Sequence, residues 1–587
     1  MGNRLAASSI QTRSNRIILT WEQLFYGIAL LCAAVLRFSN LGVVPLSPEE
    51  AENGWGVWQY WQPEVADSLP EVSSAAWFSL TALLTQVGGY SDLLMRLFPA
   101  IAGILAIIAV TKLRAFTGRL GGVIAAFVLA ISPLMVSISR MATGDSLAIL
   151  SLILSIGFFL EWQANSTNRS IFWLAGWLGF GLTTSPVFYS GLLAFGFAYL
   201  LQSLIGSKIF SQFELPEDDA RTRTIAIFAA VFVLSATMFL LNLGGIGAFT
   251  NILETWFLNF GGFSDLSSIA DPLFSLLQYE TIIFVVGIAA VLVMGLFQDH
   301  TSSFLAYWMI GSLLLFVVQV GELSNALIFM LPAALIVGRA LDQVISQVPL
   351  NHLFSTYPDG GMGLPLAGIC GLLLLIAATN LGRFSRTGFD QSLGQAHYFL
   401  FLVCVVLVIA MLVTITIYDR LSGTIGFLTT CLLISAVYGW GTAWRLSNSH
   451  ANDTRERWVT LASDSEIRLL NDTLDEAGES IFGFEQSLEI YSTVDNSVLR
   501  WYLRDYPEVQ FVSAVTPETV ADAIITPDNV ELQAGSDYTG SDFGLLLTDQ
   551  DPDLQFRTRL RWWLYGESNT DLIDSRIILW LRTDLVR

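Results

Sequence analysis

The sequence contains few of the side chains that cross-link a chain or bind metals. Its four cysteines (Cys32, Cys370, Cys404 and Cys431) all lie within apolar runs, and no CxxC pair occurs. A disulfide framework and a CxxC metal site are therefore excluded. The four histidines are scattered without the spacing of metal ligands. We therefore expect neither redox chemistry nor a histidine-based metal centre.

Charged residues are also scarce, at 13% of the 587 residues, whereas 53% are apolar. Apolar runs of about 20 residues recur along the chain, which is the length that a helix needs to cross about 30 Å of hydrocarbon. This pattern predicts an all-α polytopic membrane domain. Hydropathy predicts about thirteen spans, near residues 17–38, 98–115, 119–138, 146–161, 168–185, 187–206, 222–242, 281–297, 303–320, 323–345, 363–380, 397–417 and 421–444.

Lys and Arg set the predicted orientation, because cationic loops resist translocation. With residues 1–16 as a cytoplasmic tail, twelve Lys and Arg side chains before residue 445 fall on the inner side and five on the outer side. We expect the first span to be an uncleaved anchor, since further spans follow it. An odd number of spans over residues 17–444 then places the C-terminal residues outside the cell membrane.

Residues 445–587 differ sharply in composition from the membrane part. They hold 26 Asp and Glu against 12 Arg and no Lys, and they contain no apolar run long enough to span. The segments EQSLEIYST, SVLRWYLRDY and VQFVSAV are typical of strand, helix and strand, and ADAIITPD and FGLLLTDQ are typical of further strands. We predict a small soluble extracytoplasmic α/β domain. No glycine-rich phosphate loop follows its first strand, so neither a nucleotide cofactor nor a nucleic-acid partner is expected.

The longest predicted external loop of the membrane part, residues 39–97, begins with a cluster of carboxylates. Glu49, Glu50 and Glu52 fall within four residues and are followed by several tryptophans. Tryptophans are common where a loop lies on the bilayer interface. Carboxylates at the lipid boundary are costly unless they face a wet cavity or a cation, so this cluster is a candidate functional site. The alternative is a solvated loop without a function.

A second acidic position follows the third predicted span. Arg140 and Asp145 lie in a short external turn, where Asp145 either caps the next helix or contributes to a site. The loop between the seventh and eighth spans adds carboxylates without Lys or Arg. Such an outer face can hold a divalent cation, with Asp145 as a candidate ligand, or supply a general base. The residues added by that loop are Glu254, Asp265, Asp271 and Glu280.

Several motifs resemble one family of membrane enzymes. They are R-F-x-x-L-G-x-x-P-L-x-x-E-E-A at 37–51, GGYSDLLMRLFPAIAG at 88–103 and SP-x5-SR-x4-D at 132–145. Their order resembles the GT-C class of membrane glycosyltransferases, in particular family 39 and the protein mannosyltransferases. In that class an acidic pair in the first external loop carries the catalytic base.

Three further segments resemble a prokaryotic branch of this class that is known from archaeal N-glycosylation loci and named flippase-activity-associated. They are LLQYETIIFVVGIAAV at 277–292, ELSNALIFMLPAALIVGRAL at 322–341 and LRWYLRDYPEVQFV at 499–512. Together with the earlier motifs they touch most of the chain.

The resemblance implies transfer of a sugar from a polyprenyl-phosphate donor, held in the membrane lipid, to an acceptor glycan or protein at the outer face. Glu49 or Glu50 is then the candidate base. The candidate phosphate ligands are cationic, although an Arg at a span end also reaches lipid headgroups by default. The candidate substrate-binding residues are Arg37, Arg96, Arg140, Asp145, Tyr279 and Glu280.

The sequence departs from the family pattern at three places. The acidic pair begins with Glu49 where the family has Asp, residues 67–80 contain no histidine, and the segment before Pro332 lacks the usual Pro-Trp and His. These departures leave a second hypothesis open, in which the chain is a non-catalytic relative that assists lipid-linked glycan assembly or binds partners through its external domain. A secondary transporter is a third hypothesis, which the scarcity of charges within the spans disfavours.

Overall fold

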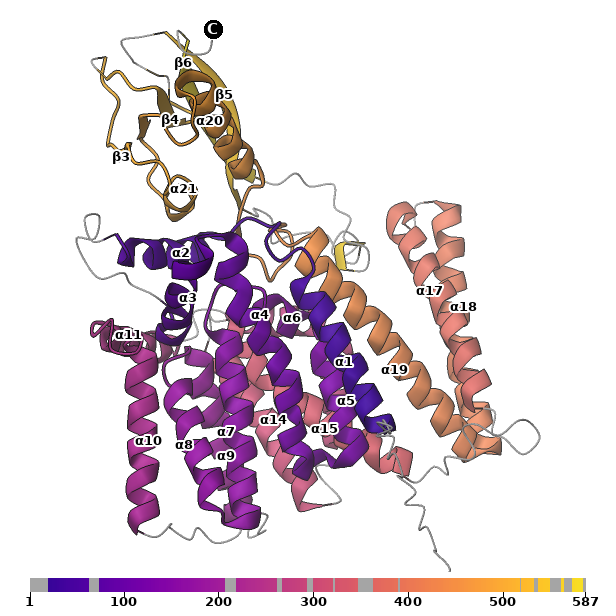
Figure 1. Ribbon diagram of the computed structural model, residues 1–587. Helices are drawn as coiled ribbons and strands as arrows, with labels where there is room; N and C mark the ends of the chain where they lie inside the picture. The colour runs from indigo at the N-terminus through magenta and orange to yellow at the C-terminus, as the bar shows by residue number, and fades with distance from the viewer. Residues whose placement is uncertain are drawn as a thin grey trace, which may run out of the picture.

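The computed structural model shows a helical bundle with a small sheet-containing module at one end (Figure 1). The predicted cytoplasmic tail, residues 1–16, and Asp265 lie outside the described residues. The structure describes residues 20–62, 73–205, 218–260, 267–292, 299–319, 323–346, 363–388, 391–517, 519–530, 532, 537–548, 561–563 and 573–583.

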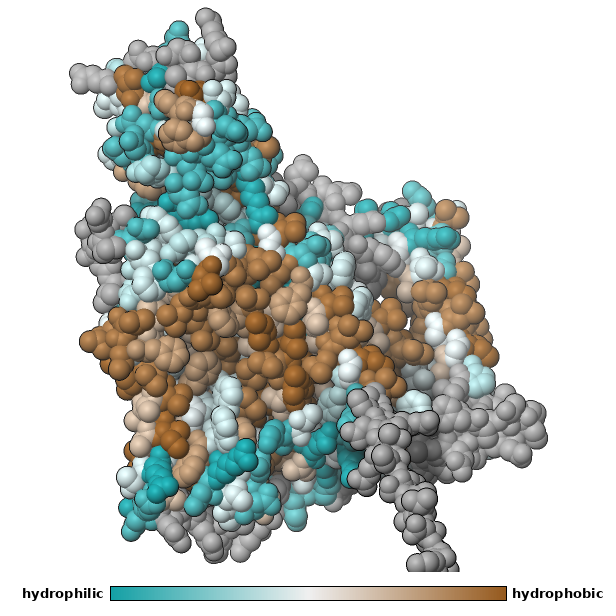
Figure 2. Space-filling model, viewed as in Figure 1, coloured by the Kyte–Doolittle hydropathy of each residue, from teal (hydrophilic) through white to brown (hydrophobic). Residues whose placement is uncertain are grey.

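Each of the thirteen predicted ranges overlaps a helix of the bundle. Apolar side chains form a broad belt across the face that Figure 2 shows, as expected for helices in contact with lipid. The helices are α1 (Trp21–Phe38), α4 (Asp92–Ala109), α5 (Arg114–Ile131), α7 (Asp145–Asn165), α8 (Asn168–Gly181), α9 (Pro186–Leu204), α10 (Asp218–Ala236), α13 (Thr281–Ala290), α14 (His300–Val318), α15 (Ala326–Ser346), α17 (Gly363–Thr387), α18 (Ser392–Tyr418) and α19 (Arg420–Trp444).

Length and composition alone identify fewer membrane-crossing helices than these thirteen. Among the described residues, eight helices are long and apolar enough to cross, or nine if the bent pair Pro272–Tyr279 and Ile283–Ala290 forms one span. The difference arises partly because α8 has 14 residues and α13 has 10, short of the roughly 20 that a perpendicular span needs. The number thirteen therefore stays a prediction, and the chain is an integral membrane protein on either count.

Close helix packing in the bundle depends on glycine. Gly121 of α5 lies against Gly338 of α15, and a Cβ atom on Gly338 would come within 2.3 Å of the Gly121 carbonyl oxygen. Small residues let helix backbones approach closely, which is a main source of packing energy inside a membrane. The hairpin of α17 and α18 packs against α19 and lies at the edge of the bundle (Figure 1).

Short helices occupy the end of the bundle nearest the C-terminal module. The predicted external loop 39–97 contains two of them, α2 (Pro48–Tyr60) and α3 (Ala75–Gly88). Ser47 starts α2 because its hydroxyl accepts from the Glu50 amide while the Glu50 carboxylate accepts from the Ser47 amide, and Pro48 occupies the first turn. The remaining short helices at this end are α6 (Pro133–Ile138), α11 (Gly245–Leu258), α12 (Ser267–Tyr279), and the single turns η3 (Leu323–Asn325) and η4 (Arg445–Ser449). The single turn η1 (Val110–Leu113) lies elsewhere, between α4 and α5, where Lys112 pairs with Glu161 near the end of α7.

The C-terminal module is a six-stranded mixed sheet with strand order β1-β5-β6-β4-β2-β3. Strand β2 pairs in parallel with β3 and β4, and the other pairs are antiparallel. The predicted α/β organisation is confirmed, with the strand, helix and strand at β2, α21 and β3. The elements are β1 (Leu461–Ser463), α20 (Glu466–Phe482), β2 (Ile490–Ser492), α21 (Ser497–Tyr502), β3 (Val509–Phe511), β4 (Ala523–Pro527), β5 (Tyr538–Thr548) and β6 (Ile573–Arg582).

Candidate active-site cavity

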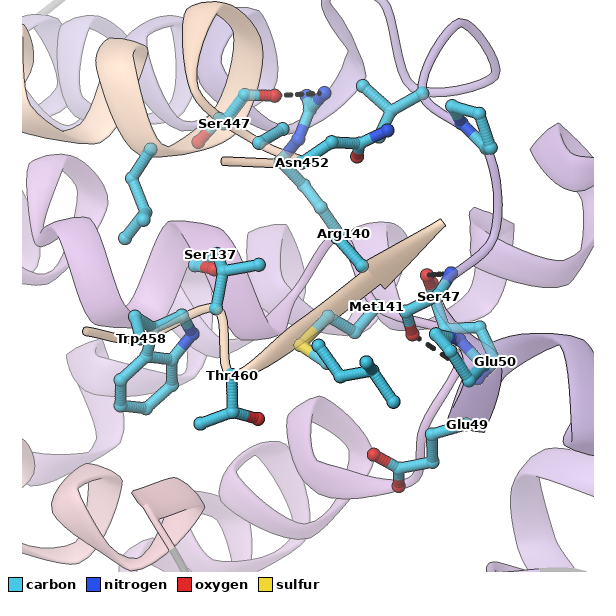
Figure 3. Close-up of a pocket in the computed structure, with 18 of the residues that line it drawn as sticks. Ser47, Glu49, Glu50, Ser137, Arg140, Met141, Ser447, Asn452, Trp458 and Thr460 are labelled. Atoms are coloured by element: carbon cyan, nitrogen blue, oxygen red, sulfur yellow. Dashed lines mark hydrogen bonds between the residues drawn. The ribbon is translucent and has the colours of Figure 1, made fainter. Parts of the chain in front are cut away.

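A cavity of about 290 Å³ lies where the helical bundle meets the segment that leads to the C-terminal module. We call this segment, residues 445–460, the connecting segment. One wall of the cavity comes from the start of α2, from α4 and from the turn after α6, and the other comes from the connecting segment and β1 (Figure 3). The cavity therefore depends on residues that are hundreds of positions apart in the chain.

Glu49 and Glu50 have different surroundings although they are neighbours on α2. Glu49 is exposed and lines the cavity, and Figure 3 shows its carboxylate extending away from the α2 backbone. Glu50 is 2% exposed, and its Oε2 atom lies 2.6 Å from Arg96 Nη2. The Glu50 carboxylate also accepts from the Ser47 amide at 2.9 Å and the Ala142 amide at 2.8 Å. Glu50 is therefore buried among protein contacts, whereas Glu49 is exposed at the cavity.

Arg96 lines the cavity as well, but its guanidinium holds the loop before α2 in place. Besides the ion pair with Glu50, its Nη1 and Nη2 atoms donate to three carbonyl groups in residues 41–45, at 2.7 to 3.2 Å. Arg96 is 5% exposed. It fixes the backbone that carries Glu49 and adds a positive charge to this side of the cavity.

Arg140 is the second cation of the cavity. Its Nη1 atom donates to three carbonyl groups at the C-terminal end of α1, and its Nη2 atom donates to the Ser447 carbonyl at 2.9 Å. Burial, followed by the positive charge of Arg96, lowers the pKa of Arg140 to about 10. The side chain stays cationic at neutral pH, so both predicted cations Arg96 and Arg140 contribute positive charge here.

Arg37, the third predicted cation, does not line the cavity. It is 0% exposed within α1, and its Nη1 atom donates to the Ala33 and Ala130 carbonyl groups. Its position lies behind the Arg140 side chain, whose guanidinium contacts the Arg37 carbonyl. Arg37 therefore supports the wall from inside the bundle.

Tyr279 and Glu280 lie at a second cavity, also of about 290 Å³, whose lining is mostly apolar. This cavity lies between α5, α13, α15 and α19, and the start of α6 also lines it. The Glu280 carboxylate accepts from Ser132 Oγ at 2.5 Å and from the Leu134 amide at 3.1 Å, which ties the bend between α12 and α13 to α6. Neither predicted residue lines the first cavity.

Asp145 lies close in the chain to the turn that Glu50 contacts. Gly144 occupies the N-cap of α7 and Asp145 is the first helical residue, with Thr143 Oγ1 donating to it at 3.2 Å. The two acidic stretches thus meet through Glu50 and Ala142, although Asp145 does not line the first cavity. Among the described residues, no group of three or more His, Cys, Asp or Glu side chains can hold a metal ion. The cation site at Asp145 stays a prediction, and we derive no step through a cation.

The C-terminal module contacts the loop of residues 39–97 through hydrogen bonds and an ion pair that the sequence did not indicate. Asp92 accepts from Trp501 Nε1 at 2.9 Å and from the Tyr502 hydroxyl at 2.8 Å, and it forms an ion pair with Arg468. The Tyr502 hydroxyl also accepts from the Leu46 amide at 3.2 Å. These residues connect the module to the backbone just before Glu49. In the sequence, residues 499–512 stood out only as a segment that resembles the family, and that resemblance did not predict these contacts.

Further contacts hold the start of α2 itself. The Ser497 hydroxyl donates to the Pro48 carbonyl at 2.9 Å, and the Trp501 ring packs on Gly54, where a Cβ atom would meet it at 3.0 Å. A side chain at position 54 would thus press against the ring. Helix α21 and helix α2 therefore form one packed unit, with Glu49 at its edge.

Comparison with known proteins identifies the fold. Residues 74–233 match the family described as dolichyl-phosphate-mannose-protein mannosyltransferase. The crystal structure of ArnT from Cupriavidus metallidurans bound to undecaprenyl phosphate is similar over 96% of this chain and 98% of that chain, with a TM-score of 0.53 and 13% identity. The chain has a GT-C fold.

A GT-C oligosaccharyltransferase from Archaeoglobus fulgidus, tethered with an acceptor peptide, is also similar, over 83% of this chain and 63% of that chain, with a TM-score of 0.46 and 14% identity. Comparison with curated protein sequences gives no match. The GT-C fold predicted from the motifs is confirmed, and the prokaryotic flippase-activity-associated branch stays a prediction.

Proposed function

We propose that this protein transfers a sugar from a polyprenyl-phosphate-linked donor to an acceptor at the extracytoplasmic face of the membrane. The observation that carries the proposal is the first cavity, in which the exposed carboxylate of Glu49 shares a lining with the cations Arg96 and Arg140. The GT-C fold supports it, since the ArnT structure with this fold was solved with undecaprenyl phosphate bound.

In the proposed reaction, Glu49 is the general base. Its carboxylate accepts the proton of the acceptor hydroxyl as the oxygen attacks the anomeric carbon of the donor sugar. The bond between that carbon and the phosphate oxygen breaks, and the polyprenyl phosphate leaves with an additional negative charge. The positive charge of Arg140 stabilises this charge in a partly enclosed site, while Arg96 is paired with Glu50 and positions the loop beside it.

The second cavity supports a lipid donor in particular. Its lining consists mostly of apolar side chains of α5, α13, α15 and α19. The two cavities share α6, since Ser132 and Pro133 at its start line the second cavity and Ser137 near its end lines the first. A donor with its phosphate at Arg140 can therefore lay its isoprenoid chain against this apolar surface, where packing contacts rather than transfer out of water favour binding.

The non-catalytic alternative has one observation in its favour. Most of the polar groups around the predicted acidic pair are engaged within the protein, since Glu50 is paired with Arg96 and the arginines donate to backbone carbonyl groups. In this alternative the second cavity still binds a lipid chain, but no sugar is transferred and Glu49 does not act as a base.

A transfer assay separates the two proposals. Membranes that contain the wild-type protein, Glu49→Gln or Glu52→Gln are given a panel of labelled polyprenyl-phosphate sugars, and labelled product is measured. Glutamine keeps the size of the side chain but accepts no proton, so Glu49→Gln should lower turnover by about 10² to 10⁴. Glu52 is exposed on α2 and does not line the cavity, so its variant serves as the matched control. Equal turnover of Glu49→Gln and wild type would refute the base assignment, and an inert wild type would favour the non-catalytic alternative.

A further inference from the structure

The connecting segment supplies one wall of the first cavity, and this wall differs chemically from the opposite one. Trp458, Thr460 and Asn452 line it, and in Figure 3 Trp458 lies across the open space from Glu49. The lining residues from 446 to 462 include no Asp, Glu, Lys or Arg. The wall from the helical bundle, in contrast, carries Glu49 and two arginines. A ligand in this cavity therefore meets charges on one side and a neutral surface on the other.

The neutral wall is held in place by contacts at several points. The Tyr279 hydroxyl donates to Glu456 Oε2 at 2.8 Å and accepts from the Trp458 amide at 3.3 Å. Arg445 forms an ion pair with Glu456, their Nε and Oε1 atoms 3.1 Å apart. Asn452 Nδ2 donates to the Ser463 carbonyl at 3.0 Å. Because this wall is already ordered, ligand binding does not have to offset the conformational entropy of ordering it. Such preorganisation favours selective binding.

The side chains of this wall match the chemistry of a neutral sugar. An indole offers a large flat apolar face and one N–H donor, and a pyranose ring has apolar C–H faces edged by hydroxyl groups. Thr460 is exposed, and its hydroxyl can both donate to and accept from a sugar hydroxyl. A mostly apolar lining with a few placed polar groups is typical of small-molecule sites.

We propose that Trp458 and Thr460 form the subsite for the donor sugar and determine which neutral hexose is accepted. This inference rests on the proposed function, which places the donor phosphate at the arginines of the opposite wall. It gives the connecting segment a role in substrate selection and gives Tyr279 the role of a positioning residue that acts through the Trp458 backbone.

Binding measurements on the purified full-length protein test the subsite directly. The probes are undecaprenyl-phosphate-linked glucose, mannose and galactose, together with bare undecaprenyl phosphate. The variants are Trp458→Ala, Trp458→Phe, Thr460→Val and, as a control, Trp173→Ala, which removes a 50% exposed tryptophan of α8 that does not line the cavity. Thermal unfolding verifies that each variant is folded.

Trp458→Ala should weaken binding of the preferred sugar-bearing lipid by about tenfold or more and change binding of bare undecaprenyl phosphate by less than about twofold. Trp458→Phe, which keeps an aromatic face, should restore part of the affinity, and Thr460→Val should reduce the preference among the three hexoses. Trp173→Ala should behave as wild type. Equal weakening for sugar-bearing and bare lipid would show a structural role only and would overturn the proposal, as would unchanged binding of all probes.

A parallel transfer assay distinguishes this inference from the proposed function. A wild type that binds with the selectivity described but transfers no sugar would end the transferase proposal and keep the subsite. If the wild type and Trp458→Ala transfer sugar with the same donor preference, the subsite proposal is wrong and the transferase proposal stands. A wild type that binds none of the probes would overturn both.

Discussion

At the residue scale, two adjacent glutamates have divided their roles through helical geometry. Successive residues on a helix point about 100° apart, so Glu49 and Glu50 cannot face the same environment. Glu50 points into the protein and meets Arg96, while Glu49 points toward the cavity. The sequence left the base as either residue, and the structure favours Glu49 for that role.

Replacing Glu50 should damage stability rather than chemistry. Removing one partner of a buried ion pair leaves the other charge uncompensated and costs about 3–5 kcal/mol. Glutamine keeps one acceptor oxygen, so we expect a loss near the lower end, about 3 kcal/mol, for Glu50→Gln. Thermal and denaturant unfolding of the solubilised protein measure it, with the exposed Glu52→Gln as a control that should stay within about 0.5 kcal/mol. An unchanged unfolding midpoint for Glu50→Gln would contradict the structural role.

At the element scale, the position of α2 is set by the contacts of Trp501 and Tyr502 with Asp92 and Leu46, which we call the clamp. Tyr502 is its central residue, because one hydroxyl group donates to Asp92 and accepts from the Leu46 amide. Burial, reinforced by the nearby Asp92 carboxylate, raises the pKa of Tyr502, so this hydroxyl keeps its proton across the physiological range. The hydrogen bonds that the Tyr502 hydroxyl makes should therefore not change with pH near neutrality.

Tyr502→Phe should remove the hydrogen bonds of the hydroxyl group while the aromatic ring stays packed in the core. A hydrogen bond to a charged group contributes about 1.5–3 kcal/mol, and the variant leaves the Asp92 contacts with Trp501 and Arg468 intact. We expect a loss of that size in unfolding free energy and faster proteolysis of the C-terminal module. The control is Tyr418→Phe, since the Tyr418 side chain is 87% exposed. Identical proteolysis of the two variants would argue against the clamp.

The apolar second cavity makes a separate prediction about the lipid chain. Ala289 is exposed and lines that cavity, so Ala289→Phe fills part of it at little cost in packing. The apparent KM for a long-chain donor should rise by about tenfold, equivalent to ~1.4 kcal/mol of binding. A short-chain donor analogue should be unaffected, and Ala410→Phe on the exposed face of α18 is the matched control. The cavity has no part in donor binding if long and short donors respond alike.

At the scale of the whole molecule, the C-terminal module and the segment that leads to it complete a cavity at one end of a membrane bundle. The first cavity exists only because residues near position 49, near position 140 and near position 458 meet there. Its side of the membrane then follows from the orientation of the helices, which the distribution of Lys and Arg predicts. The proposed reaction requires the cavity to be extracytoplasmic, where lipid-linked donors replace nucleotide sugars.

A reporter fusion tests this orientation. A reporter that is active only outside the cytoplasm, fused after residue 450, should be active, and the same reporter fused after Asn165 at the end of α7 should be silent. The expectation follows from the positive-inside bias, with twelve Lys and Arg on the inner side against five on the outer. The opposite pattern would place the cavity in the cytoplasm and remove the basis for a donor at the outer face.

The sequence by itself determined the long helices of the bundle, part of the C-terminal module and the class of fold. Apolar runs gave the helices because a chain in lipid must satisfy its backbone hydrogen bonds within each segment, so the local sequence is sufficient. The pattern after Trp444 gave β2, α21 and β3 for a similar local reason. It also drew attention to Glu49, Arg96 and Arg140, which the structure brings to one cavity.

Only the tertiary structure decided how those residues are used. No local pattern shows that Glu50 is neutralised by Arg96, 46 positions away, or that Tyr279 holds the Trp458 backbone from 179 positions away. Such contacts depend on how helices pack and on where the C-terminal module docks. The physical reason is that a polar group is assigned its role by the partner that satisfies it when buried, and for these residues that partner is supplied by another part of the chain.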